Sequence, residues 1–133
     1  MAAQGRKHVH GKTGVRFKAA YTATKEKSML RNVVSELIVH GHVTVTSGVK
    51  KELVSLADKM VTYAKAGDLA SRRQAARVIR HDIVDEKGVQ ALDKLFAEIG
   101  PKFKDRNGGY TTAVKLGARK GDNAELVLIS WVD

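Results

Sequence analysis

The chain has 133 residues, of which 43% are hydrophobic and 29% charged, so it is long and apolar enough to fold as one domain with a hydrophobic core. It contains no cysteine, which excludes disulfides and thiolate metal ligands and is expected of a protein from a reducing cytosol. No stretch reaches the roughly 18 apolar residues that a membrane-spanning helix requires.

The formal net charge of +10 is concentrated in two segments. Residues 1–27 hold seven Lys and Arg against one acid, and residues 101–121 hold six against one, whereas residues 28–100 are nearly balanced. A surface that only keeps a protein soluble normally mixes both signs of charge. Positive charge gathered in glycine-containing segments beside a near-neutral core predicts binding to a polyanion, of which nucleic acid is the usual one.

The first half of the chain predicts a tail, a helix, a strand and a second helix. Residues 1–20 are basic, contain three glycines and show no apolar period, so we expect an extended tail. A helix is expected over about 22–40, ended by Gly41, because five apolar residues share one helical face: Leu30, Val33, Val34, Leu37 and Ile38. Residues 42–46 alternate with β-branched residues, as a short strand does.

Three further helices are expected before the last part of the chain. The first covers about 49–66, with Ser47 as its cap and Gly67 at its end. Asp68 is a natural N-cap for the next, a narrow basic helix that we expect to run to about residue 81 with Arg72, Arg73, Arg77 and Arg80 along it. The last covers about 87–99 and is expected to stop at Gly100-Pro101.

The remainder of the chain predicts a β-hairpin. Residues 110–116 alternate, residues 117–123 form a polar glycine-rich loop, and residues 125–132 are a mostly apolar strand. The order of elements predicts an α+β fold, a two-layer single domain with four helices packed on a small sheet that ends in the C-terminal hairpin. We therefore divide the chain into a basic tail, 1–20, and an α+β domain, 21–133.

Two glycine-containing loops carry the most specific chemistry. In residues 102–110, Gly108-Gly109 lets the backbone approach a phosphate closely, and Tyr110 can either stack on a base or pack in the core. At the hairpin tip, Arg119 and Lys120 lie between two glycines. Because aromatic residues make up only 5% of the chain, we expect phosphate and shape recognition of folded RNA rather than base stacking.

Metal and nucleotide sites are not expected. The chain has two His-x-His pairs, at residues 8–10 and 40–42, but no cysteine and no third ligand nearby. Gly11-Lys12-Thr13 resembles the end of a phosphate-binding P-loop, yet the first glycine of that motif would fall at Arg6. No cofactor is therefore expected.

Nothing in the sequence marks an enzyme. No serine or threonine lies in a recognisable catalytic setting, and the nearest acidic cluster, Asp82, Asp85 and Glu86, is better interpreted as a solvated helix end or cap. Two alternatives remain open from the residues: a free-standing nucleic-acid-binding protein of the nucleoid or RNA-chaperone type, and a metal-dependent RNA-processing enzyme that uses the histidine pairs.

A series of motifs resembles one known family. The motifs recur in order over about residues 5–130: MLRN at 29–32, AKAGDL at 64–69, RRQA at 72–75, KLFAEI at 94–99, DRNGGYT at 105–111 and RKGDNA at 119–124. They resemble the ribosomal protein L17 family of the bacterial large subunit. The resemblance implies a cytoplasmic structural constituent of the large ribosomal subunit that supports translation, without catalysis or a required cofactor.

The resemblance also implies partners and contact residues. The partners would be large-subunit rRNA and neighbouring ribosomal proteins near the exit-tunnel region, with no membrane and no small-molecule substrate. The rRNA contacts carried over by position are Arg6, Lys7, Lys12, Arg16, Lys18, Arg31, Arg72, Arg73, Arg106, Asn107, Gly108, Tyr110, Arg119 and Lys120. The chain departs from the family pattern at two positions near the C-terminus: Thr112 stands where the family usually has arginine, and Glu125 replaces a typical proline.

Overall fold

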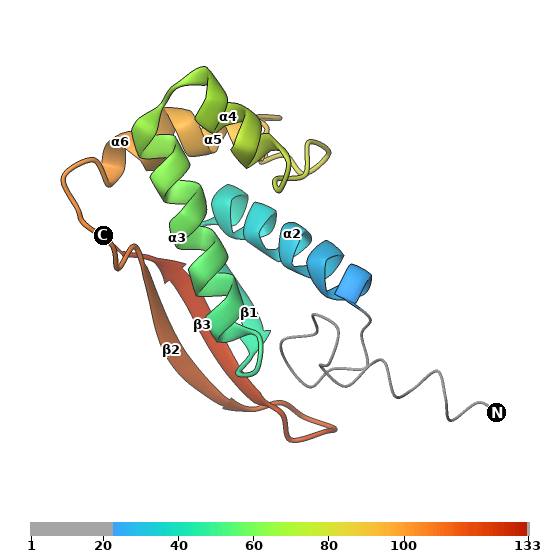
Figure 1. The fold of residues 1–133 in the computed structure, drawn as a ribbon. Coiled ribbons are helices and arrows are strands. Elements are labelled where there is room, and N and C mark those ends of the chain that lie inside the picture. The colour runs from blue at the N-terminus through green and yellow to red at the C-terminus, as the bar shows by residue number, and fades with distance from the viewer. Residues whose placement is uncertain (1–22, 133) are drawn as a thin grey trace.

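The computed structural model describes residues 23–132, so the predicted tail lies outside the described residues. Its elements in chain order are α2 (Ala23–His40), β1 (His42–Thr46), α3 (Lys50–Ala66), α4 (Leu69–Ala76), α5 (Ala91–Lys94), the π-helical turn η2 (Leu95–Ile99), α6 (Gly100–Lys102), β2 (Thr111–Ala118) and β3 (Glu125–Trp131) (Figure 1). The consecutive segments α5, η2 and α6 together form the fourth helix, which confirms the predicted α+β fold class. No helix within residues 23–132 has the length and apolar character needed to cross a membrane.

The three strands form one antiparallel sheet in the order β1-β3-β2. The last strand is therefore the central one, with His42 opposite Ser130 on one side and Thr111 opposite Trp131 on the other. A bulge between Lys115 and Gly117 shifts the register of the hairpin by one residue. The predicted hairpin and the predicted strand 42–46 are both confirmed, and β3 joins them.

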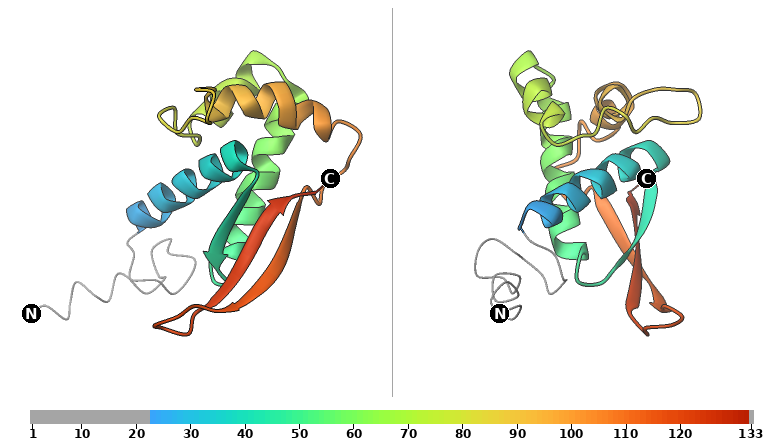
Figure 2. Two further views of the ribbon diagram at one scale, coloured as in Figure 1. Left: turned by 180° about the vertical axis from the view of Figure 1, so that it is seen from behind. Right: turned by 90° about the vertical axis from the view of Figure 1, so that its right-hand side faces the viewer.

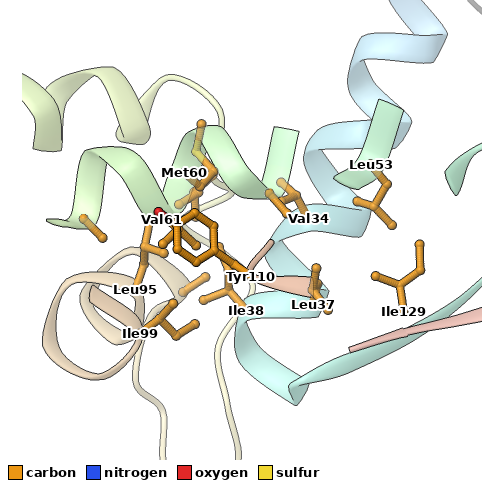
Figure 3. Close-up of a cluster of buried hydrophobic side chains, with 14 of the residues drawn as sticks. Val34, Leu37, Ile38, Leu53, Met60, Val61, Leu95, Ile99, Tyr110 and Ile129 are labelled. Atoms are coloured by element: carbon orange, nitrogen blue, oxygen red, sulfur yellow. The ribbon is translucent and has the colours of Figure 1, made fainter. Parts of the chain in front are cut away.

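The core lies between the sheet and the helices. The predicted apolar face of α2 is confirmed: Leu30, Val34, Leu37 and Ile38 are buried and Val33 is partly buried. They meet Leu53 and Met60 of α3, Leu95 and Ile99 of the fourth helix, and Ile129 of β3 (Figure 3). Burial of such side chains contributes about 1.5–3 kcal/mol each relative to exposure, so this cluster is the main source of stability.

The helices are arranged in two groups along α3. Helices α2 and α3 contact the sheet through β1 and β2 respectively, while α4 packs on α3 and the fourth helix packs on both α2 and α3. Figures 1 and 2 show α4 and the fourth helix at the C-terminal end of α3 and the tip of the hairpin at the opposite end of the molecule.

The ends of α2 and α3 follow the glycines expected from the sequence. Gly41 (φ 84°) and Gly67 (φ 70°) adopt the left-handed conformation that closes a helix, and their amides donate to Leu37 and Tyr63. Asp68 caps α4 as predicted, accepting a hydrogen bond of 2.8 Å from the Ser71 amide. The prediction that Ser47 caps α3 is wrong, because Val49 occupies the N-cap position and makes no side-chain cap bond.

The third helix is shorter than predicted. It ends at Ala76 rather than near residue 81, because the amides of Arg77 and Val78 bond to carbonyls only three residues back and tighten the turn. The Arg80 amide then donates to the Ser35 hydroxyl of α2 at 2.9 Å. This contact draws the chain across to α2, so Arg77 and Arg80 follow the helix instead of lying along it.

Both ends of the fourth helix also differ from the prediction. It begins at Ala91, because the Asp85 carboxylate accepts from the amides of Lys87 and Val89 and holds that segment in a turn. It continues through Gly100-Pro101 to Lys102. Proline donates no amide hydrogen and its ring clashes with the carbonyl four residues back in a regular helix, and the wider π-helical turn just before it, where Gly100 bonds to Leu95, relieves that conflict.

Candidate nucleic-acid interface

The first basic loop, residues 102–110, is anchored by aromatic side chains. Phe103 and Tyr110 are buried, their ring centroids 5.2 Å apart, and Trp131 lies 5.9 Å from Phe103. Gly108 (φ 79°) and Gly109 (φ 62°) adopt left-handed conformations, so the chain turns between these anchors and the backbone lies exposed. The loop is thus a short exposed backbone segment fixed at both ends.

Tyr110 is part of the core. Its hydroxyl receives a hydrogen bond from Lys65 Nζ at 3.0 Å and donates to the Arg106 carbonyl at 3.2 Å, while Lys65 Nζ also reaches that carbonyl at 2.6 Å. The proximity of the lysine lowers the pKa of the Tyr110 hydroxyl. The side chain is only 4% exposed, so of the two alternatives for Tyr110 the structure supports packing, and its ring is not accessible to a base.

The neighbouring predicted residues remain exposed. Arg106 donates from Nε to the Gly109 carbonyl at 3.2 Å, which uses one of its five donor hydrogens. Asn107 and Gly108 are exposed. These three residues are therefore free to contact a phosphate backbone at this loop.

At the hairpin tip, Arg119 is held by its own neighbour. Its guanidinium forms a two-point ion pair with the Asp122 carboxylate, with Nε 3.0 Å from Oδ1. This contact lowers the pKa of Asp122 to about 2 and raises that of Arg119. The Ala124 amide also donates to Asp122 at 3.2 Å. Because Asp122 is engaged by Arg119 and Ala124, Lys120 is the exposed and unpaired cation of the tip within the described residues.

The two basic loops do not form one site. Residues 102–110 precede β2 and the tip follows it, so the eight residues of β2 separate them. At about 3.3 Å per strand residue this separation is roughly 25 Å. Figure 2 shows the loops at different ends of the sheet, so a single ligand must be extended to touch both.

The predicted arginines in the helices have structural contacts. Arg72 pairs with Asp93 at 2.5 Å and its guanidinium lies 5.1 Å from the Phe96 ring, which joins α4 to the fourth helix. Arg31 donates from Nε to the Val78 carbonyl at 2.9 Å, whereas Arg73 is exposed. The other predicted contacts, Arg6, Lys7, Lys12, Arg16 and Lys18, lie outside the described residues.

Sequence reasoning missed one group of basic residues. Lys27, Lys59 and Arg77 line a groove of about 760 Å³ together with Arg31 and Arg80. The spacing of Lys27 and Arg31 places them one helical turn apart, which the sequence does reveal. That Lys59 and Arg77 face them depends on how α3 and the turn after α4 pack on α2, and no local pattern encodes it.

The histidine pairs and the acidic cluster were not expected to form a metal or catalytic site. His8 and His10 lie outside the described residues, and within residues 23–132 no three His, Asp or Glu side chains gather as a metal site. In the acidic cluster, the turn contacts of Asp85 lower its pKa. Asp85 therefore serves as a turn cap, as the sequence suggested.

The comparisons with known proteins point to one class. The large ribosomal subunit protein bL17 of Limosilactobacillus reuteri (strain DSM 20016) is 46% identical over 123 residues, covering 87% of this chain and 97% of that protein. The corresponding proteins of Shouchella clausii (strain KSM-K16) and Leuconostoc citreum (strain KM20) are 43% and 42% identical over 86% and 87% of the chain. These relatives are proteins of the large ribosomal subunit.

The family model described as Ribosomal protein L17 matches residues 29–132. This chain belongs to the ribosomal protein L17 family.

Proposed function

We propose that this protein is a structural constituent of the large ribosomal subunit and binds large-subunit rRNA through phosphate and shape contacts. The observation that carries the proposal is the separation of exposed basic groups over distant parts of the fold, at Arg73, Arg106 and Lys120, around a core of ordinary composition. A small-molecule site gathers its polar groups in one pocket, whereas folded RNA can meet cations at several places. Family membership supports the same conclusion.

The same proposal assigns the protein a structural rather than catalytic role in the bacterial cytoplasm. It takes neighbouring large-subunit proteins near the exit-tunnel region as further partners. Exposed apolar residues of β2 support a protein contact, because Val114 and Leu116 are 52% and 53% exposed. Exposed large apolar residues close together in one strand are typical of a surface that a partner covers.

The experiment that tests this function is sedimentation of cell lysate through a high-salt sucrose gradient, with the protein quantified by mass spectrometry. We expect stoichiometric recovery in the large-subunit peak. Recovery only in the light fractions, or loss from the subunit at modest salt, would favour a free-standing nucleic-acid-binding protein instead. That alternative should bind duplex DNA and unrelated RNA about as well as rRNA.

A further inference from the structure

A basic groove lies between α2, α3 and the turn that follows α4. Its volume of about 760 Å³ is within the range of roughly 300–1,000 Å³ that ligand sites occupy. Five of its lining residues are cations, namely Lys27 and Arg31 of α2, Lys59 of α3, and Arg77 and Arg80 beyond α4, whereas one, Glu52, is an acid. Three segments distant in sequence thus bring positive charge to one concave surface.

These cations are not neutralised within the described part of the chain. None of the five forms an ion pair with a carboxylate of residues 23–132, in contrast to Arg72 and Arg119. Like charges brought together without counter-ions repel one another, so this arrangement costs stability unless an anion offsets it. The groove therefore has the electrostatic character of an anion site.

Two of the guanidinium groups are held in position by neutral partners. Arg80 donates to the Asn32 side-chain oxygen at 3.0 Å and to the Ser28 hydroxyl at 2.7 Å, and Arg31 donates to the Val78 carbonyl at 2.9 Å. These bonds use only some of the donor nitrogens of each guanidinium. Because the partners are neutral, each group keeps its full positive charge. Arginines fixed in this way lose little further entropy on binding a phosphate.

The rest of the lining favours a nucleic-acid backbone over a base. Thr24, Ser28 and Ser55 supply hydroxyls that can donate to phosphate or sugar oxygens. No aromatic side chain is among the lining residues within 23–132, so nothing there offers a base a stacking partner.

The charge of the chain's own N-terminal segment does not complement the groove. Residues 1–22 carry five Lys and Arg and no acid, so their charge has the same sign as the groove. The complementary partner of five cations is a polyanion, and for a protein proposed to bind rRNA that polyanion is RNA.

We propose that this groove binds the sugar-phosphate backbone of large-subunit rRNA, with Lys59 and Arg77 contacting phosphates beside the fixed Arg31 and Arg80. The inference rests on the proposed rRNA-binding function. Apart from Arg31, it assigns that function to groove residues that the sequence motifs did not indicate.

The test compares two double variants of the full chain that remove the same charge. Lys59→Ala with Arg77→Ala removes exposed groove cations, and Lys51→Ala with Lys87→Ala removes exposed cations outside it. Binding to deproteinised large-subunit rRNA is measured over a range of salt concentrations. Each phosphate that the protein neutralises contributes about 0.7–0.9 to the steepness of the log–log salt dependence. We expect the slope of the groove variant to be shallower by about 1.4–1.8 and that of the control variant to match the unmodified protein.

A second measurement uses the unmodified protein. Acylation of lysines by an amine-reactive reagent is followed by mass spectrometry with and without the rRNA. We expect rRNA to protect Lys59 but not Lys51 of the same helix. Equal protection of Lys59 by inorganic phosphate at the same phosphate concentration would overturn the proposal in favour of a free-anion site.

The outcomes separate this proposal from the proposed function. If the groove variant keeps the full slope while Arg106→Ala with Lys120→Ala lowers it, the groove is not an RNA site and rRNA binding stands. If the unmodified protein prefers large-subunit rRNA no more than unrelated RNA of equal length, the proposed function fails and the groove proposal fails with it.

Discussion

The side chain of Tyr110 connects the first basic loop to α3. Its ring lies in the buried cluster with Met60 and Val61 (Figure 3), and its hydroxyl bridges Lys65 and the Arg106 carbonyl. Burial raises the pKa of the Asp58 carboxyl in α3, and the nearby backbone of Tyr110 opposes that shift. The basic loop therefore depends on this residue for its position.

We expect Tyr110→Phe to lower the free energy of unfolding by about 1 kcal/mol. The substitution keeps the ring but removes the hydroxyl and its two hydrogen bonds, to Lys65 and to the Arg106 carbonyl. The measurement is urea unfolding, read as a lower midpoint at unchanged slope. Tyr63→Phe is the matched control, since the Tyr63 hydroxyl makes no hydrogen bond within residues 23–132. A loss of stability no greater than that of the control would contradict the role given to Tyr110.

Residue chemistry could be predicted from the sequence where it acts locally. Asp68 and Gly67 were recognisable because a cap or a left-handed turn is determined by its immediate neighbours. The pairing of Arg119 with Asp122 is equally local, and its i, i+3 spacing could have indicated it. By contrast, the choice between stacking and packing for Tyr110 depends on α3, which lies more than forty residues earlier in the chain.

At the scale of elements, Gly100 determines how closely the fourth helix approaches α3. A Cβ atom built at this position would lie 2.9 Å from the Ala64 carbonyl oxygen and 3.2 Å from the Ala64 Cβ. The carbonyl oxygen belongs to the backbone of α3 and the Cβ is bonded directly to it, so neither atom can rotate away. The glycine predicted to end the helix thus serves instead as a contact point between two helices.

Gly100→Ala should destabilise the protein by about 1–3 kcal/mol, because the overlap with α3 exceeds the gain of roughly 1 kcal/mol in helix propensity. Thermal unfolding measures the change. Gly48→Ala is the control: its added Cβ meets nothing within 4 Å and its φ is not positive, so it should be neutral or slightly stabilising. An equal or higher melting temperature for Gly100→Ala would show that the two helices can separate without cost.

Helices and strands were predicted correctly where the hydrophobic periodicity agrees with the glycines and caps that bound a segment. The predictions failed where tertiary contacts determine the bounds of an element. The strand over residues 42–46 and the helix over about 22–40 were found because alternation and a helical face are properties of the segment itself. The third helix is shorter than its sequence indicates because the Arg80 amide bonds to Ser35, a residue of α2, and not to a carbonyl of its own helix. The central position of β3 likewise follows from pairing with β1, nearly ninety residues away.

At the scale of the whole molecule, charge and core belong to different parts of the chain. The buried apolar side chains within the described residues run from Leu30 to Ile129, whereas the most basic stretch of sequence lies before them. The sequence itself shows that the basic residues gather in segments outside the apolar core. A polyanion was therefore predictable as the general class of ligand. The groove was not, because its five cations converge only after α2, α3 and the turn beyond α4 have packed.

This separation predicts the effect of removing residues 1–18. The deletion takes away five Lys and Arg and no acid, so the salt slope of rRNA binding should become shallower by up to about 3.5–4.5, at 0.7–0.9 for each phosphate that those bases neutralise. The melting temperature should change little, because the core formed within residues 23–132 keeps all of its residues in the deleted chain. Replacing the same five bases with glutamine in the full chain tests whether charge or length matters, and we expect it to weaken binding as much as the deletion does. A much lower melting temperature for the deleted chain, with the glutamine variant unaffected, would instead make the N-terminal segment part of the fold, since the deletion would then have removed packing as well as charge.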